Sequence, residues 1–320
     1  MVRPTRIARL SLSSAVLLAL AAPAWGYVRK RTDGGIPEYW QVSCMPTTVY
    51  TNGFWDMTID EIGKSISAAA HAWSPSAVTC PDGVSHPFLE IVLQMARDDT
   101  KPPLPAYDGH NTVIFFTESF RPPENSPIQL GVIALTSVFA RADGHIVDAD
   151  VQLNAIDYDW ANRDENFGPA NGLDPYDLQN AITHEFGHFQ GLGHTCWAPF
   201  SDFEQPIDDK DAGVPLCEAT PADSGLAQTV MFATIDGPGE LTKRTLSADD
   251  IRAVCEIYPA ASDPHSCSID TPADGCGCSA AAGPAEIVEG AGLLALAAVV
   301  IALRRRAIVR SRPAPPADRG

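Results

Sequence analysis

The order of helical and strand-like segments predicts an α+β fold for this chain of 320 residues. One helical pattern precedes a series of strand-like segments, and two further helical patterns follow them. The folded body is expected to run from about residue 36 to residue 260. Hydrophobic residues make up 45% of the chain, which is enough for a sizeable core.

The first helix is expected from Thr58 to Trp73, where apolar residues recur at helical spacing. Thr58 and Glu61, three residues apart, form a capping box at its start. The polar stretch 155–172, rich in Gly and Asn, predicts a loop. Between these segments, strands are expected at residues 88–95, 112–117, 130–139 and 145–153.

The second helix is expected from Pro175 to Gln190. Asp174 is a favourable N-cap, and Pro175 suits the first helical position. Gly191 can adopt the left-handed conformation that ends a helix and turns the chain back. A third helix is expected to begin after the capping residue Ser247.

The second helix carries the residues with the clearest chemistry. His184 and His188 are four residues apart, so their imidazoles project from one face and can bind one metal ion. The turn at Gly191 lets His194 supply a third ligand, which leaves the fourth position of a tetrahedral zinc ion open for water, as in catalytic sites. Glu185 lies beside the ligands, where it can act as a base on that water. The alternative is three unrelated histidines with partners in the core.

Residues 184–194 match the pattern His-Glu-x-x-His-x-x-Gly-x-x-His of the metzincin metallopeptidases. Thr195 resembles the matrixin branch of that family, in which Ser or Thr follows the third histidine. Met231 resembles the Met-turn methionine under the zinc, and the alternative for it is an ordinary core methionine. Residues 246–251 resemble the start of the closing helix of matrixin catalytic domains, so the resemblance covers most of the expected body.

The resemblance implies a zincin-like catalytic domain with a twisted, mostly parallel five-stranded sheet, an active-site helix and a small C-terminal subdomain. An edge strand, for which residues 131–139 are the candidate, would bind an extended peptide in antiparallel fashion. The segment from Met231 to Ile235 would line the pocket for the residue after the cut. The implied activity is that of a zinc metalloendopeptidase acting on extracellular proteins, with Glu185 as general base and Zn²⁺ held by His184, His188 and His194. We expect the protein to act as a monomer.

Two other functions stay open. A protein that keeps the fold and the zinc but has lost catalysis would be a surface-anchored binding module, and the intact Glu185 argues against it. A metzincin of another branch, such as an exopeptidase, is the second alternative, and Thr195 argues against it. The chain lacks the matrixin pro-region, whose cysteine caps the zinc, so the resemblance does not explain latency.

The body of the chain is strongly acidic. Between residues 32 and 303 it has 10 Lys and Arg against 39 Asp and Glu, a net charge of −29. Such a body repels a phosphate backbone, which argues against a nucleic-acid partner. Because hard oxygen ligands suit calcium, Ca²⁺ is a second cofactor candidate, with ligands among Asp143, Asp148, Asp150 and Asn154. The alternative for these four residues is a role in turns and at strand ends.

Both ends of the chain are typical of addressing signals. Residues 1–26 combine arginines, an apolar run and small residues, which is the pattern of a secretory signal peptide. Residues 287–303 predict a transmembrane helix, and 304–320 a basic cytoplasmic tail. With the Cys-containing linker at 261–284, this end resembles the myxobacterial C-terminal sorting tag (MYXO-CTERM). That resemblance implies a processing protease and a place at the cell surface or release from it, and the alternative is a plain single-pass anchor.

Eight cysteines in an exported protein favour disulfides. Proximity in the sequence suggests the pairs Cys44–Cys80, Cys196–Cys217 and Cys255–Cys267. Six cysteines allow 15 pairings, so these pairs are hypotheses. A cysteine zinc cluster is the alternative, but the sequence has no Cys-x-x-Cys pair to support it.

Overall fold

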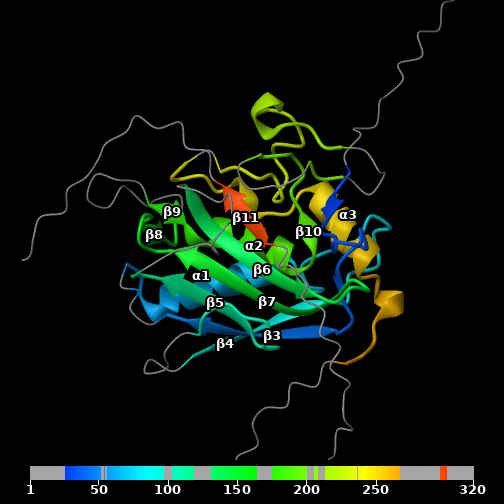
Figure 1. Ribbon diagram of the computed structural model, residues 1–320, viewed down its shortest axis with the longest axis horizontal. Helices are drawn as coiled ribbons and strands as arrows, with labels where there is room; N and C mark the ends of the chain where they lie inside the picture. The colour runs from blue at the N-terminus through cyan, green and yellow to red at the C-terminus, as the bar shows by residue number, and fades with distance from the viewer. Residues whose placement is uncertain are drawn as a thin grey trace, which may run out of the picture.

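A twisted sheet with helices on one face forms the core of the molecule (Figure 1). The computed structural model describes residues 26–51, 54, 56–96, 103–118, 131–163, 175–199, 205–207, 213–235 and 237–266, and the backbone of 296–300. The main strands are β3 (Cys44–Tyr50), β4 (Glu90–Met95), β5 (Asn111–Phe116), β6 (Val132–Ala140) and β7 (His145–Asn154). The helices are α1 (Ile59–Ala72), α2 (Leu178–Phe189) and α3 (Ala248–Ile257).

The main strands lie in the order β6-β7-β5-β3-β4. The last four run parallel to one another, and β6 is antiparallel to β7. A two-residue strand, β2 (Tyr39–Trp40), adds to β7 in parallel. The predicted combination of helices with a mostly parallel sheet is therefore confirmed. The sequence did not predict β3, because Pro46 and the two threonines after it obscure its alternation.

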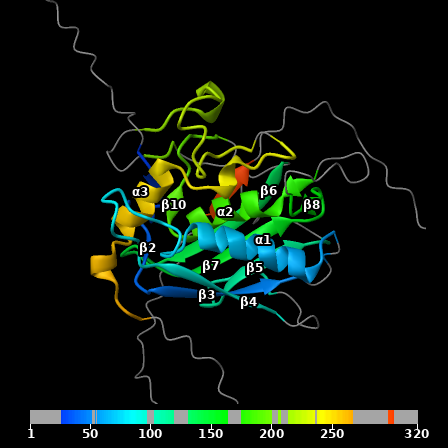
Figure 2. The same cartoon turned by 180° about the vertical axis from the view of Figure 1, so that it is seen from behind.

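Helices α1 and α2 lie side by side on one face of the sheet (Figure 2). The predicted capping box of α1 is present, since Glu61 N donates to Thr58 Oγ1 at 3.2 Å and Thr58 N donates to Glu61 Oε2 at 2.8 Å. Buried Trp73, which ends α1, donates its indole N–H to the carbonyl of Thr183 in α2 at 2.8 Å. Ser247 caps α3 as the sequence predicts. Helix α1 therefore packs directly against α2.

The second helix begins three residues later than the sequence predicts. Its first residue is Leu178 rather than Pro175, and its N-cap is Asp177, whose Oδ1 accepts from Asn180 N at 2.7 Å. Asp174 lies outside the described residues. Two short parallel strands cause the difference, because pairing holds the two residues before α2 extended. These strands are β8 (Trp160–Ala161) and β9 (Tyr176–Asp177).

The body also begins earlier than expected. Strand β1 (Val28–Arg29) pairs antiparallel with β10 (Leu192–Gly193), and Tyr27 and Val28 are buried. The Tyr27 hydroxyl donates to Glu256 Oε2 in α3 at 2.8 Å. Residues upstream of position 36 thus form part of the core and contact the segment that follows α2.

Two of the three predicted disulfide pairs are wrong. Cys80 pairs with Cys255, across 175 residues, and this pairing excludes both Cys44–Cys80 and Cys255–Cys267. Cys44 is disulfide-bonded as well. The predicted Cys196–Cys217 pair is present, 21 residues apart. Proximity in the sequence did not predict this pair, because the fold brings the turn that follows α1 next to α3.

The chain ends lie mostly outside the described residues. This holds for the predicted signal peptide up to residue 25, for most of the linker at 261–284, and for the tail at 304–320. Of the predicted transmembrane helix at 287–303, the structure describes Leu296–Val300, which form strand β11, antiparallel to β6. The helical prediction is wrong for these five residues, because an apolar run with two valines can complete the free edge of a sheet. No helix among the described residues is long and apolar enough to cross a membrane.

Candidate metal centre

Three histidines meet at the end of α2. The Nε2 atom of His188 lies 3.1 Å from Nε2 of His184 and 3.1 Å from Nε2 of His194. All three side chains are buried, with 1–2% of their surface exposed. Their ring nitrogens lie within 4.8 Å of one another, and within the described residues they are the group that could hold a metal ion.

The hydrogen bonds of the rings orient the histidines as metal ligands. His184 Nδ1 contacts the carbonyl of Val230, and His188 Nδ1 lies 2.8 Å from the carbonyl of Leu192. A carbonyl can only accept, so each Nδ1 carries the proton and each Nε2 presents a lone pair. Lone pairs that face one another at 3.1 Å repel unless a cation lies between them. The donor set therefore fits a metal ion.

The protonation of the rings agrees with this role. Burial, reinforced by the positive charge of Lys243, holds the pKa of His184 well below its ordinary value. Burial and the neighbouring His194 lower the pKa of His188 in the same direction. Both rings are therefore neutral near pH 7, and neutral imidazole is the form that binds metal.

The turn after α2 brings the third histidine back to the first two. Gly191 has a φ of 86°, the left-handed conformation that the sequence predicts, and a Cβ there would lie 2.7 Å from the carbonyl oxygen of Glu38. The next two residues form β10, which pairs with β1 of the N-terminal segment. This pairing holds the chain between Gly191 and His194 extended, so the third imidazole reaches the other two.

Glu185 lies beside the histidines and is 1% exposed. Burial raises the pKa of its carboxyl to about 8, although the Thr136 hydroxyl, which donates to Oε2 at 2.6 Å, acts in the opposite direction. Thr136 belongs to β6 and was not predicted as a site residue. Its distance of 49 residues from Glu185 leaves no sequence signal for the contact.

Met231 lies against the backbone of α2. A Cβ placed on Gly187 would overlap Met231 Sδ, so the thioether is directly beneath the turn that carries the first two histidines. The methionine carbonyl accepts from Thr195 N at 3.0 Å, and the hydroxyls of Thr195 and Thr229 lie 2.8 Å apart. These contacts tie the residue after His194 to the segment around Met231.

The expected pocket wall from Met231 to Ile235 is backed by a disulfide. Phe232 and Ala233 are buried in a small apolar cluster with Cys196 and Cys217. The segment after Met231 thus packs against the disulfide whose first cysteine lies two residues after His194.

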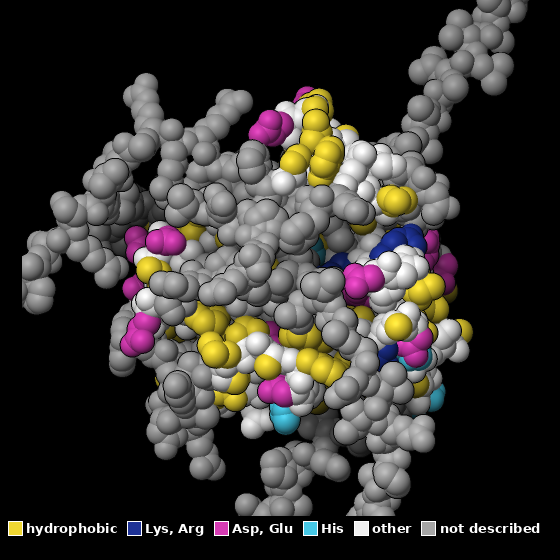
Figure 3. All heavy atoms as spheres, viewed as in Figure 1, with side chains coloured by type: hydrophobic (Ala, Val, Ile, Leu, Met, Phe, Trp, Pro, Cys, Tyr) yellow, Lys and Arg dark blue, Asp and Glu magenta, His cyan; other side chains and the backbone are white. Residues whose placement is uncertain are grey.

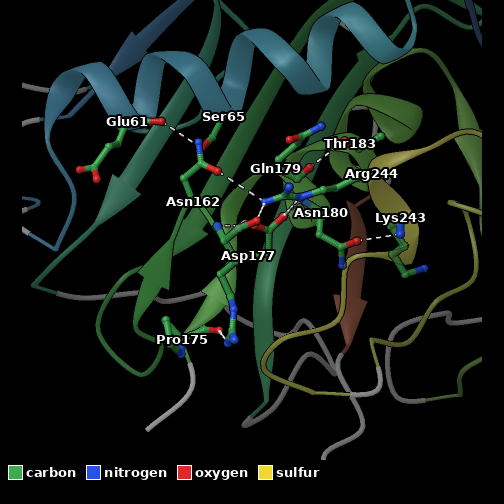
Figure 4. Close-up of polar contacts among 11 residues, drawn as sticks. Glu61, Ser65, Asn162, Pro175, Asp177, Gln179, Asn180, Thr183, Lys243 and Arg244 are labelled. Atoms are coloured by element: carbon green, nitrogen blue, oxygen red, sulfur yellow. Dashed lines mark hydrogen bonds and ion pairs between the residues drawn. The ribbon is translucent and has the colours of Figure 1, made fainter. Parts of the chain in front are cut away.

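A polar network surrounds the N-terminal end of α2, and the sequence did not predict it (Figure 4). The short 3-10 helix η2 (Thr242–Arg244) lies beside the first turn of α2. Arg244 Nε donates to Asp177 Oδ1 at 2.8 Å, and its Nη2 bonds the other carboxylate oxygen. Lys243 N donates to Asn180 Oδ1 at 2.7 Å. The metal-binding helix is therefore held at its start by residues from about 60 positions further along the chain.

The calcium candidates do not converge on one point. Asp148 accepts from the backbone N–H groups of Asp108 and Gly109 at 2.8 and 2.9 Å, and Asp150 accepts from the Thr112 hydroxyl and from Ala106 N. These two carboxylates are neighbours on β7. The other two candidates lie in separate turns. Asp143 accepts from a backbone N–H in the turn after β6, and Asn154 accepts from two backbone N–H groups in the turn after β7. Most of these oxygens therefore fix loops, and a calcium site stays a prediction.

In comparisons with known proteins, no family model matches the chain and no curated protein is detectably similar to it in sequence. The function of the site therefore has to be inferred from its own geometry.

Proposed function

We propose that the protein is a zinc metalloendopeptidase of the matrixin-like metzincin type. The observation that carries the proposal is the buried group of three Nε2 lone pairs with a buried carboxylate beside it. Three imidazoles suit zinc, and a three-ligand set leaves a position for water. The left-handed Gly191 and the contact between Met231 and α2 support the metzincin assignment.

The residues divide the chemistry between them. Zinc, when bound, would supply a Lewis acid for the scissile carbonyl and lower the pKa of a water molecule. Glu185, ionised when a cation at the three histidines lowers its raised pKa, takes the proton of the attacking water and delivers it to the leaving amine. Thr136 holds one oxygen of that carboxylate at 2.6 Å and so fixes its direction. The carbonyls of Val230 and Leu192 orient the rings of His184 and His188.

The edge of the sheet next to this centre suits an extended peptide. Strand β6 carries Thr136, and its outer edge accepts an antiparallel strand, as the pairing with β11 illustrates. In that register Ala297 lies opposite Thr136, so a peptide that took the place of β11 on this edge would pass the residue that contacts Glu185. We therefore favour a protein or peptide substrate bound as an additional strand.

The acidic surface and the chain ends complete the proposal. Among the described side chains on the face shown in Figure 3, Lys and Arg are few, which disfavours a nucleic-acid partner. The signal-like residues 1–26 and the tag-like residues 275–306 favour an exported protein, either attached at the cell surface or released. Disulfides such as Cys80–Cys255 are consistent with an oxidising compartment.

The decisive experiment compares cleavage with metal content. Wild-type protein, loaded with zinc, should cleave a denatured protein substrate, and a chelator should abolish the cleavage. Glu185→Gln should keep the zinc but lose at least about a hundredfold in rate, since general-base catalysis contributes 10²–10⁴. Glu90→Gln removes an exposed carboxylate on β4 and should behave as wild type.

The outcome separates the competing functions. Zinc-loaded wild type that cleaves no protein or peptide substrate under any condition would favour the catalytically silent binding module. Removal of single terminal residues only, with no internal cuts, would favour an exopeptidase of another metzincin branch.

A further inference from the structure

A buried lysine lies behind the metal centre and has no place in the chemistry described above. Lys243 is only 3% exposed. Its Nζ donates to the carbonyl of Val230 at 2.9 Å and also to the carbonyl of Phe232. These two carbonyls flank Met231, so a single ammonium group holds both sides of the segment that packs beneath the histidines.

The carbonyl of Val230 has two donors. It accepts from Lys243 Nζ and from Nδ1 of the ligand His184. The amide of the same residue donates to Asp250 Oδ2 of α3 at 2.9 Å. The backbone of Val230 is thus held at both its N–H and its carbonyl, and the carbonyl determines where the imidazole of His184 points.

The backbone of Lys243 fixes the same segment to α2. Its N–H donates to Asn180 Oδ1, 2.7 Å away on the first turn of the metal-binding helix, as Figure 4 shows. The next residue, Arg244, bonds the N-cap Asp177 of that helix. The segment around Met231 and the helix that carries His184 are therefore held in register through η2.

Burying an ammonium group is unfavourable, and an apolar side chain of similar length would fill the space without that desolvation. Partners that orient metal ligands from behind commonly govern metal affinity. We propose that Lys243 is a positioning residue of the metal centre, which holds the Val230 carbonyl where it orients His184. The proposal rests on the metal site of the proposed function and is independent of peptide hydrolysis.

Two variants of the full chain test it. Lys243→Met removes all donors, whereas Lys243→Gln keeps an amide that can donate to one carbonyl. We expect zinc affinity, measured by competition with a chelator, to fall 10–100-fold in Lys243→Met and less in Lys243→Gln. The visible absorption of the Co²⁺-loaded protein should shift in the same order, because it reports the ligand geometry. Lys64→Met is the control, since that lysine is exposed and pairs with Asp60.

Equal zinc affinity and an equal Co²⁺ spectrum in wild type and both variants would overturn the proposal. If Lys243→Met does not fold, Lys243→Gln decides alone, and wild-type affinity with a wild-type spectrum in that variant overturns it. A wild-type protein that binds zinc but hydrolyses nothing would defeat the proposed function and leave these measurements meaningful.

Discussion

At the scale of single residues, Gly187 marks the closest approach in the site. A Cβ at this position would overlap Met231 Sδ and would lie 3.2 Å from Trp73 Cζ2. Glycine in the middle of a helix is unfavourable by about 1 kcal/mol relative to alanine. Its presence in α2 is explained by the contact with Met231, which a larger residue would push away from the histidines.

We therefore predict that Gly187→Ala weakens the protein although alanine favours helix. Overpacking a buried contact of this kind costs about 1–3 kcal/mol of unfolding free energy. Zinc affinity should fall as well, because Met231 is tied through its carbonyl to Thr195, next to His194. Urea denaturation and chelator competition measure the two effects.

The matched control is Gly63→Ala in α1. No atom lies within 4 Å of a Cβ at Gly63, so this substitution should stabilise the protein by about 1 kcal/mol. A Gly187→Ala protein as stable as Gly63→Ala would show that the contact with Met231 is not tight.

Some residues of the site can be recognised from the sequence alone, and others cannot. The three histidines and Glu185 lie within one stretch of eleven residues, where the helical period and one left-handed glycine determine their relation. Thr136 and Lys243 could not be found in this way. Thr136 is ordinary in a strand, and a lysine is usually exposed, so only the folded contacts reveal their roles.

At the scale of elements, the start of α2 depends on two contacts with other segments, the pairing of β9 with β8 and an ion pair with a distant arginine. Residues 174–177 offer two aspartates as N-caps, and Pro175 favours the earlier start. In the structure Arg244 bonds both oxygens of Asp177, whose side chain is fully buried. Local signals therefore predict the helix and its end, whereas its first residue depends on the β8–β9 pairing and on an ion pair across 67 positions.

Arg244→Met should accordingly destabilise the protein. The substitution leaves the carboxylate of Asp177 buried without its guanidinium, and breaking such a pair costs about 3 kcal/mol. Equilibrium unfolding in urea measures the change.

Lys64→Met gives the comparison with an exposed ion pair. The side chains of Lys64 and Asp60 are 67% and 74% exposed, so losing their pair should lower the unfolding free energy far less than losing the pair of Arg244 and Asp177. Similar losses in the two variants would contradict the role assigned to Arg244.

At the scale of the whole molecule, the sheet contains a pair of carboxylates that opposes folding at neutral pH. Burial raises the pKa of Asp150 to about 7, and the neighbouring Asp148 adds to the rise. The pKa of Asp148 is also raised, mainly by burial. The folded protein therefore binds a proton at Asp150 more tightly than the unfolded chain does.

The unfolding free energy should fall as the pH rises from about 4 to about 7. The contribution of Asp150 is fully present below its ordinary pKa of 3.8 and is lost as the pH reaches 7. A shift of about three units corresponds to roughly 4 kcal/mol at most. Asp150→Asn should flatten this part of the profile, measured by urea unfolding at several pH values.

Asp82→Asn is the control for this profile. Hydrogen bonds from Ser85 and Val84 lower the pKa of Asp82 to about 2, so its titration affects stability only below pH 4. An unchanged slope between pH 4 and 7 in Asp150→Asn would contradict the prediction. Added calcium that abolishes the slope in wild type would instead support a cation beside Asp148 and Asp150.

The sequence by itself determined the features that depend on neighbours along the chain. These are the amphipathic α1 with its capping box, four strands of the sheet, and the spacing from His184 to His194 with the turn at Gly191. Helical and strand periods and the conformational freedom of glycine act within a few residues, so they can be read directly.

The tertiary structure alone decided the features that depend on distant partners. It paired Cys80 with Cys255, moved the N-cap of α2 to Asp177, and brought Thr136 to Glu185. It also placed the ammonium of Lys243 behind His184. Each of these contacts joins segments tens of residues apart, and its energy comes from burial and hydrogen bonding that exist only after the sheet and helices have packed.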